Sequence, residues 1–179
     1  AGSGSWTASS GTLRLRDAAV VTTTGPVRIA AAGFLDVRTG EMGASDLTID
    51  EGGRVSVGSR CRLSANLSFA SQNEDDWRWV AGSSLIMTGG EGGCHGARAT
   101  LEVGGRDNGP EGTGTDNFGL RDLTLSETGS IALVDAISNG NRGPLGQPEA
   151  LYATSLTLHA GAVLDLNGLH LYVDGSPVQ

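Results

Sequence analysis

One spacing of apolar residues and glycine recurs along this chain. Two apolar residues stand two positions apart, a glycine follows six positions after the first, and two more apolar residues follow at eight and ten. Alternation with period two predicts a strand and the glycine predicts a tight turn, so the unit is strand, turn, strand. Its three copies are Val27, Ile29, Gly33, Leu35, Val37; Leu47, Ile49, Gly53, Val55, Val57; and Leu123, Leu125, Gly129, Ile131, Leu133. A fourth stretch keeps the apolar positions and shifts the glycine by one, to Gly161.

The recurrence of this unit predicts a repeat architecture. Most units begin about 20 residues apart, which is typical of one coil of a β-solenoid. They begin near Leu13, Val27, Leu47, Leu67, Leu85, Leu123 and Leu156. No stretch has helical apolar periodicity. The predicted fold class is all-β, a single-stranded right-handed parallel β-helix of about seven or eight coils with irregular loop insertions.

Three polar stretches interrupt the repeat. Residues 104–117 and 137–150 are rich in glycine and proline, and residues 71–76 read SQNEDD. These are expected as surface loops, where binding sites concentrate. We expect one solenoid domain over residues 1–179, with residues 1–10 as a linker, and expect it to be a module of a larger exported protein.

The charge of the chain restricts its partners. All 12 basic residues are arginine, and the formal net charge is −8. Nucleic acid is therefore not expected as a partner, since its binding depends on neutralising phosphates. The absence of lysine excludes Schiff-base and P-loop lysine chemistry. No apolar run is long enough to predict insertion in a membrane.

The C-terminal stretch carries a resemblance. Residues 150–173, ALYATSLTLHAGAVLDLNGLHLYV, resemble the last coils of exported bacterial β-solenoid surface proteins of the autotransporter-passenger kind. The resemblance implies an extracellular or cell-surface location and a role in adhesion, display or structure. We therefore expect a non-catalytic structural or adhesive module. Because solenoid ends expose strand edges, its expected partners are neighbouring domains or other copies joined end to end, and glycans.

Enzymes that act on polysaccharides are the alternative. Polygalacturonase-like enzymes share the scaffold and use clustered aspartates with a His-Gly motif. The corresponding groups here are Asp75 with Asp76, His95 with Gly96, and Asp116. Hydrolysis needs two facing carboxyl groups, and neighbours on a strand point to opposite sides. A lyase would need an arginine base, for which Arg98 and Arg106 are the candidates. No catalytic residue is assigned.

Trp77 and Trp79 lie beside the acidic pair Asp75 and Asp76. Two residues apart on a strand, the indoles share one face, with Arg78 on the other. On an exposed face they would form a platform for stacking sugars, which makes a carbohydrate-binding module a further alternative. Turned inward, they would fill a wide part of the core.

Calcium is the one cofactor considered. Asp107, Glu111 and Asp116 share a glycine-rich loop and offer the oxygen ligands that calcium prefers, although their spacing matches no established calcium loop. The two cysteines, Cys61 and Cys94, either pair in a disulfide or remain two separate apolar side chains.

Overall fold

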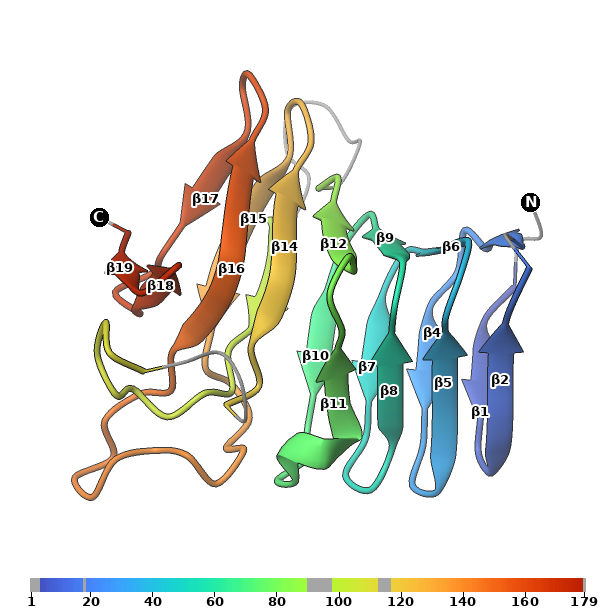
Figure 1. The fold of residues 1–179 in the computed structure, drawn as a ribbon, viewed down its shortest axis with the longest axis horizontal. Coiled ribbons are helices and arrows are strands. Elements are labelled where there is room, and N and C mark those ends of the chain that lie inside the picture. Colours follow the sequence, from blue (N-terminus) through green and yellow to red (C-terminus); the bar gives the residue numbers. More distant parts are fainter. Residues whose placement is uncertain (1–3, 18, 90–97, 113–116, 179) are drawn as a thin grey trace.

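The computed structural model describes residues 4–17, 19–89, 98–112 and 117–178. In this part the chain is all-β, with three sheets and one short 3-10 helix, η1 (Glu74–Asp76). Every pair of neighbouring strands is parallel except the last, β18 with β19. The chain visits the sheets in turn, so each strand pairs with the strand one turn later (Figure 1).

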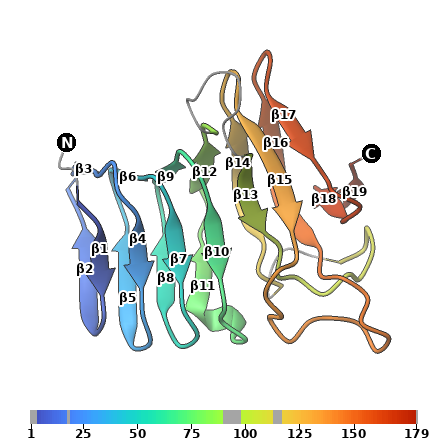
Figure 2. The ribbon, with the colours of Figure 1, turned by 180° about the vertical axis from the view of Figure 1, so that it is seen from behind.

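We name the sheets by their place in Figure 1. The back sheet, seen from the other side in Figure 2, comprises β1 (Trp6–Ala8), β4 (Val27–Ile29), β7 (Leu47–Ile49), β10 (Leu67–Phe69), β13 (Ala99–Glu102), β15 (Ser130–Val134) and β17 (Val163–Asp165). The front sheet comprises β2 (Gly11–Leu15), β5 (Gly33–Val37), β8 (Arg54–Val57) and β11 (Trp77–Trp79). The upper sheet comprises β3 (Val20–Thr22), β6 (Glu41–Ala44), β9 (Arg60–Leu63), β12 (Ser84–Met87), β14 (Leu120–Leu125), β16 (Leu151–Leu158), β18 (Leu171–Val173) and β19 (Ser176–Pro177).

The strand-turn-strand unit occurs at two different corners of the stack. In its copies at Val27 and Leu47 it joins a back strand to a front strand, whereas at Leu123 it joins an upper strand to a back strand. The predicted unit starts therefore do not form a single column. Leu13 lies in the front sheet opposite Leu35, and Leu67, in the back sheet, has Leu101 as its next partner. Leu85 belongs to a separate column in the upper sheet, where it lies between Cys61 and Leu123. Because apolar and polar residues alternate in the same way at both corners, the sequence does not distinguish one corner from the other.

The glycine of the unit serves close packing between turns. A Cβ on Gly33 would lie 2.4 Å from the Ala8 carbonyl oxygen, and one on Gly53 would lie 2.5 Å from that of Ile29. The left-handed backbone belongs instead to the preceding position, Ala32 with φ 66° or Gly52 with φ 76°. Gly161, at the fourth corner, occupies this preceding position with φ 81°. In this copy the glycine therefore stands at the position with left-handed backbone, which glycine adopts without a steric penalty. In the copies at Val27 and Leu47 the glycine of the unit instead leaves room for the backbone of the neighbouring turn.

The strained alanine gives the first prediction. Replacing Ala32 by glycine is expected to raise the free energy of unfolding by about 1 kcal/mol, because glycine adopts positive φ without the Cβ clash. Replacing its exposed neighbour Ala31 by glycine is the control, with an expected loss of about 0.5 kcal/mol from backbone entropy alone. Urea unfolding of the two variants measures the difference. Equal effects of the two substitutions would contradict the assignment of strain to Ala32.

Inward side chains stack from turn to turn into one hydrophobic core. Ile29, Ile49 and Phe69 form one such column in the back sheet, in register through β4, β7 and β10. Outward charges also join successive turns: Arg28 bonds Asp50 at 2.8 Å, and Arg62 bonds Glu41 at 3.2 Å. These exposed pairs each contribute at most about 1 kcal/mol, so the apolar columns dominate stability.

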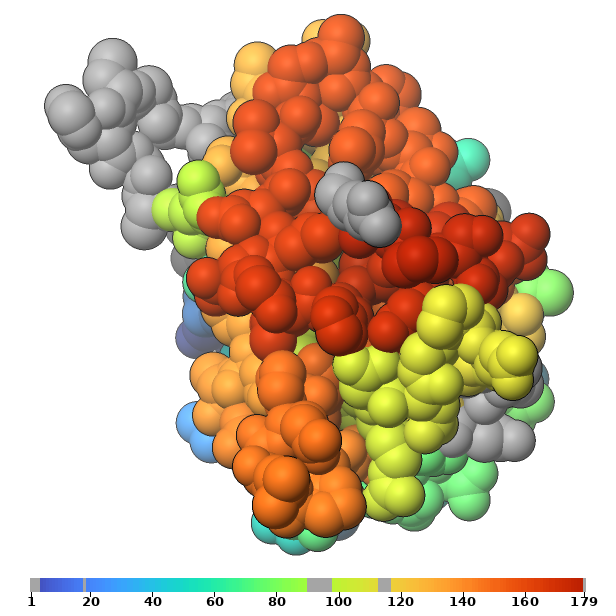
Figure 3. Space-filling model, turned by 90° about the vertical axis from the view of Figure 1, so that its left-hand side faces the viewer, coloured from blue at the N-terminus to red at the C-terminus, as the bar shows by residue number. Residues whose placement is uncertain are grey.

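The two ends of the stack differ. At the N-terminal end β1, β2 and β3 each pair on one side only, and Val20 on β3 is 69% exposed. Since β1 pairs with β4 through residues 6–8, this part of the expected linker 1–10 is a strand of the back sheet. Figure 3 shows the C-terminal end covered by β18, β19 and the loops before β14 and β16. The short edge strand β19 contains Pro177, which limits further pairing.

Candidate binding groove

A groove lies where the front sheet stops. The front sheet ends at β11, while the back and upper sheets continue for several more strands. Beyond β11 the upper strands lengthen, from four residues in β12 to six in β14 and eight in β16, and run down the front of the molecule (Figure 1). The predicted insertions 104–117 and 137–150 fall where further front strands would lie, and in their described residues they form irregular loops.

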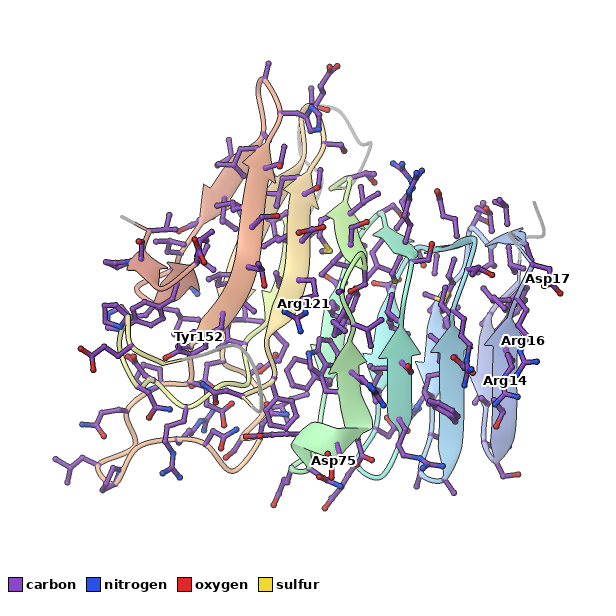
Figure 4. The ribbon with its side chains drawn as sticks, viewed as in Figure 1. Arg14, Arg16, Asp17, Asp75, Arg121 and Tyr152 are labelled. Carbon is purple, nitrogen blue, oxygen red and sulfur yellow. The ribbon has the colours of Figure 1, made fainter. Side chains whose placement is uncertain are left out.

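The groove has a volume of about 800 Å³ and mixed polar and aromatic walls. β11 and η1 form one side, and the starts of β14 and β16 with the loop at Pro110 form the other. Arg121 crosses between them, because its Nε donates to the Trp79 carbonyl at 3.2 Å. Figure 4 shows Asp75 at the foot of β11, with Arg121 and Tyr152 on the opposite side. The open edge of β11 therefore faces the groove.

Trp77 and Trp79 share one face of β11, with Arg78 on the other, as their spacing predicts. The shared face points inward, since the two residues are only 7% and 5% exposed. Of the two orientations that the spacing allows, the structure therefore has the inward one, in which the indoles fill the core and form no exposed stacking platform. Trp77 stacks on Phe69 at 4.3 Å between ring centroids, and Phe69 stacks on Phe118 at 5.4 Å. This aromatic cluster fills the core where the front sheet ends and forms the floor of the groove.

The indole N–H groups of Trp77 and Trp79 are both buried and have no hydrogen-bond partner in the described part of the chain. A buried donor without an acceptor costs about 1–3 kcal/mol. These donors make the floor of the groove chemically distinct from a plain apolar core. Sequence spacing identified the two residues but not their inward orientation.

Asp75 and Asp76 diverge from one another. Both belong to η1, which Asn73 caps by accepting a hydrogen bond from the Asp75 N–H. Asp75 lines the groove, whereas Asp76 accepts a hydrogen bond from the Ser71 hydroxyl at 3.0 Å. Asp76 is thus bonded within its own loop, and only Asp75 of the predicted pair lines the groove. His95 and Asp116 of the enzyme alternative lie outside the described residues.

Of the two arginines considered as a lyase base, Arg98 has its side chain in an ion pair, and Arg106 is held through its backbone. The Arg98 guanidinium forms an ion pair with Asp165 on β17. The backbone of Arg106 is held by Asn117, whose side chain accepts from the Arg106 N–H and donates to its carbonyl. These two hydrogen bonds hold the backbone of the loop before β14 in place at Arg106.

Of the three calcium candidates, Asp107 is held by other contacts. Asp107 lies 2.5 Å from His170 Nδ1 and accepts a hydrogen bond from the Tyr172 hydroxyl at 2.8 Å. Burial alone would raise the pKa of Asp107, but the bonds with His170 and Tyr172 outweigh it and the pKa lies below its ordinary value. A calcium ion at Asp107 would have to replace these bonds. Glu111 lines the groove, and Asp116 lies outside the described residues.

Among the residues that the structure describes, no three histidine, cysteine or acidic side chains group together as metal ligands would. Cys61 is buried in the upper sheet between Met42 and Leu85. Burial raises the pKa of its thiol to about 12, with a further contribution from the charge of Glu41. Cys94 lies outside the described residues, so the disulfide stays a prediction.

The sequence analysis did not predict a cluster of buried polar side chains that holds the loop before β16 in place. The Asn139 side chain donates to the carbonyls of Phe69 and Ser71 at 3.1 and 2.8 Å. Glu149 Oε1 accepts from the N–H groups of Asn139 and Asn141, and Glu102 accepts from that of Ile137. The Asn-Gly and Pro-Glu composition of this loop predicts an exposed turn, and no pattern in it signals burial.

The Glu102 carboxyl makes this cluster sensitive to pH. Burial raises its pKa to about 7 against opposing backbone hydrogen bonds, with smaller rises from the charges of Asp135 and Glu149. Burial also raises the pKa of Glu149 itself, while Arg142 lowers it. A raised pKa means that the folded state holds a proton that the unfolded chain releases near pH 4.5. Stability from this group is complete below that pH and is lost as pH rises through about 7.

The Glu102→Gln variant is therefore expected to lose less stability than the original chain as the pH rises from 5 to 8. The amide keeps an acceptor for the Ile137 N–H and cannot ionise. We expect a gain at pH 8 on the order of 1–2 kcal/mol after solvent screening, with little change at pH 5. Urea midpoints across this range measure it, with the exposed Glu127→Gln variant as control. A parallel shift at every pH would contradict the assignment.

Comparison of this chain with family models, with curated proteins and with solved structures finds no match to any of them. The groove and the polar cluster are thus described from their own geometry alone. In the described residues no helix has the length and apolar character required to cross a membrane.

Proposed function

We propose that the three sheets are the sides of a single-stranded right-handed parallel β-helix, and that the chain acts as a non-catalytic extracellular structural or adhesive module. The observation that carries this proposal is the regular step between β4, β7 and β10 in the back sheet. Val27 lies opposite Leu47, and Leu47 lies opposite Leu67, a step of 20 residues each time. Such a stack is a stiff scaffold whose stability sums over neighbouring turns.

The N-terminal end supports association between modules. Three strand edges end there without a further strand, and Val20 is exposed on one of them. Open edges of this kind pair with other strands unless they are covered. A copy of the same chain, or a neighbouring domain of a longer polypeptide, would cover them.

Sedimentation velocity from micromolar to millimolar concentration tests the association. We expect the chain to self-associate and the Val20→Arg variant to remain monomeric, because a charge on an edge strand opposes pairing. Leu145→Arg is the matched control, since Leu145 is 90% exposed but lies in the loop before β16. A monomer at every concentration, or an equal effect of both variants, would refute the end-to-end proposal.

The groove favours a second candidate function, a carbohydrate-binding module. Its lining includes Asp75, Arg78 and Arg121, which offer hydrogen-bond donors and acceptors for the hydroxyl groups of a sugar. The Trp6→Phe background leaves Trp77 and Trp79 as the only tryptophans, so that their fluorescence reports on the groove. A glycan that binds there should change this emission, and Arg121→Ser should weaken the effect while Arg28→Ser should not. Constant emission across a panel of glycans would eliminate this candidate.

A further inference from the structure

The outer face of the front sheet concentrates arginine in an acidic protein. Five of the twelve arginines stand on its strands or directly after them, against one acidic side chain in the same rows, Asp36. The chain as a whole carries a net charge of −8. We call these residues the arginine face: Arg14, Arg16, Arg38, Arg54 and Arg78.

The register of the sheet aligns these side chains along the stack. Arg14 lies opposite Asp36, Asp36 opposite Ser56, and Ser56 opposite Arg78. Arg14 and Arg78 are thus three strand spacings apart, about 14 Å at the usual separation of strands. Figure 4 shows Arg14 and Arg16 projecting from β2 at one end of this face, with Asp17 beside them and Asp75 near the other end. The arginine face is therefore a basic stripe bounded by acidic residues.

Asp36 fixes two of the guanidiniums. Its side chain is 1% exposed, and it accepts hydrogen bonds from Arg14 Nε at 2.7 Å and from Arg38 Nε at 3.0 Å. Both arginine side chains remain open to solvent, at 40% and 62% exposure. Because the bonds use Nε, the Nη1–Nη2 edge of each guanidinium remains as a paired donor. A planar donor pair of this kind matches a carboxylate in bidentate geometry.

Arg54 is positioned by an aromatic ring. Its guanidinium carbon lies 5.2 Å from the centroid of the Phe34 ring, on the strand next to its own. A cation held over a ring keeps its N–H groups at the rim for other partners. Arg78 is exposed on β11 and also lines the groove, so the stripe leads to the groove.

We propose that the arginine face binds a carboxylated polysaccharide that lies along the stack across β2, β5, β8 and β11. An extended chain that carries many carboxylates can reach guanidiniums distributed over all four front strands, which gives both charge and bidentate complementarity. This inference deepens the proposed adhesive function, but the edge-association test above can succeed or fail independently of it.

Calorimetric titration of the intact chain with alginate, a carboxylated polysaccharide, at low salt tests the proposal. We expect binding that weakens as salt is added, and no binding of neutral dextran. The Arg54→Ser, Arg78→Ser double variant should lower alginate affinity by at least about tenfold. Arg28→Ser with Arg62→Ser is the matched control, because these two arginines lie in the back and upper sheets and should leave the affinity unchanged.

A second variant separates donor geometry from charge. Arg14→Lys with Arg38→Lys keeps both charges but removes the oriented donor pairs, so we expect affinity to fall severalfold with circular dichroism unchanged. Four results would overturn the proposal: no binding of alginate, equal binding of dextran, equal loss in the control variant, or unchanged affinity in the lysine variant. Tighter binding of duplex DNA or anionic vesicles than of alginate would overturn it as well.

Discussion

Replacing Phe69 by alanine is expected to lower the free energy of unfolding by about 4 kcal/mol. Phe69 is 1% exposed and stacks on both Trp77 and Phe118, so its removal opens a cavity under the floor of the groove. Trp77 belongs to β11, the last strand of the front sheet, and Phe118 belongs to the loop before β14. The side chain therefore joins the regular turns to the irregular C-terminal part.

Urea unfolding with tryptophan emission measures the Phe69 effect, since Trp77 lies against the deleted ring. The control is Phe34→Ala, because Phe34 is half-buried on the outer face of β5 under Arg54. We expect a loss below about 1 kcal/mol there, of the size of one exposed cation–π contact. Similar losses for the two phenylalanines would show that the aromatic cluster has no special role.

Replacing Gly53 by alanine should cost about 3 kcal/mol, the upper range for an overpacked site. The added Cβ would lie 2.5 Å from the Ile29 carbonyl oxygen and 3.0 Å from that of Asp50. The Ile29 oxygen accepts a hydrogen bond from the Asp50 N–H of the next turn, and the Asp50 oxygen accepts one from the Gly53 N–H within the corner itself. The Ile29 oxygen therefore cannot move without weakening the pairing of β7 with β4. The expected result is a lower midpoint of unfolding and faster hydrogen exchange in these strands.

Gly82→Ala is the matched control for Gly53→Ala. Gly82 has φ 84° but no atom lies within 4 Å of its Cβ position. Alanine there should cost only the penalty of left-handed backbone, about 1–2 kcal/mol. If Gly53→Ala were no more harmful than Gly82→Ala, close approach between turns would not be the reason for glycine in the repeated unit.

The repeated spacing predicted strands and corners well because it reflects local chemistry. Val27 to Val37 form β4, a turn and β5, and Leu123 to Leu133 form β14, a turn and β15. Alternation reports which side chains face inward, and glycine reports where backbone approaches backbone. Neither indicates which strand will lie opposite. The unit start after Leu67 was therefore placed at Leu85, which lies in another sheet, whereas Leu67 pairs with Leu101.

The candidate site was only partly predictable for the same reason. The Trp77 and Trp79 pair and the loop 71–76 stood out in the sequence, and both contribute to the groove. Their orientation depends on what lies beyond β11, and there the front sheet ends. Glu102 and Asn139 gave no signal, because their burial follows from contacts with segments distant along the chain.

The sequence by itself determined the all-β class, the strand-turn-strand corners and the positions that face the core, because side-chain alternation and glycine sterics act within a few residues. Only the tertiary structure decided that the parallel strands divide among three sheets, that the front sheet stops after four strands and leaves a groove, and that five arginines share its outer face. These features depend on register between turns, which is set by packing across the whole stack.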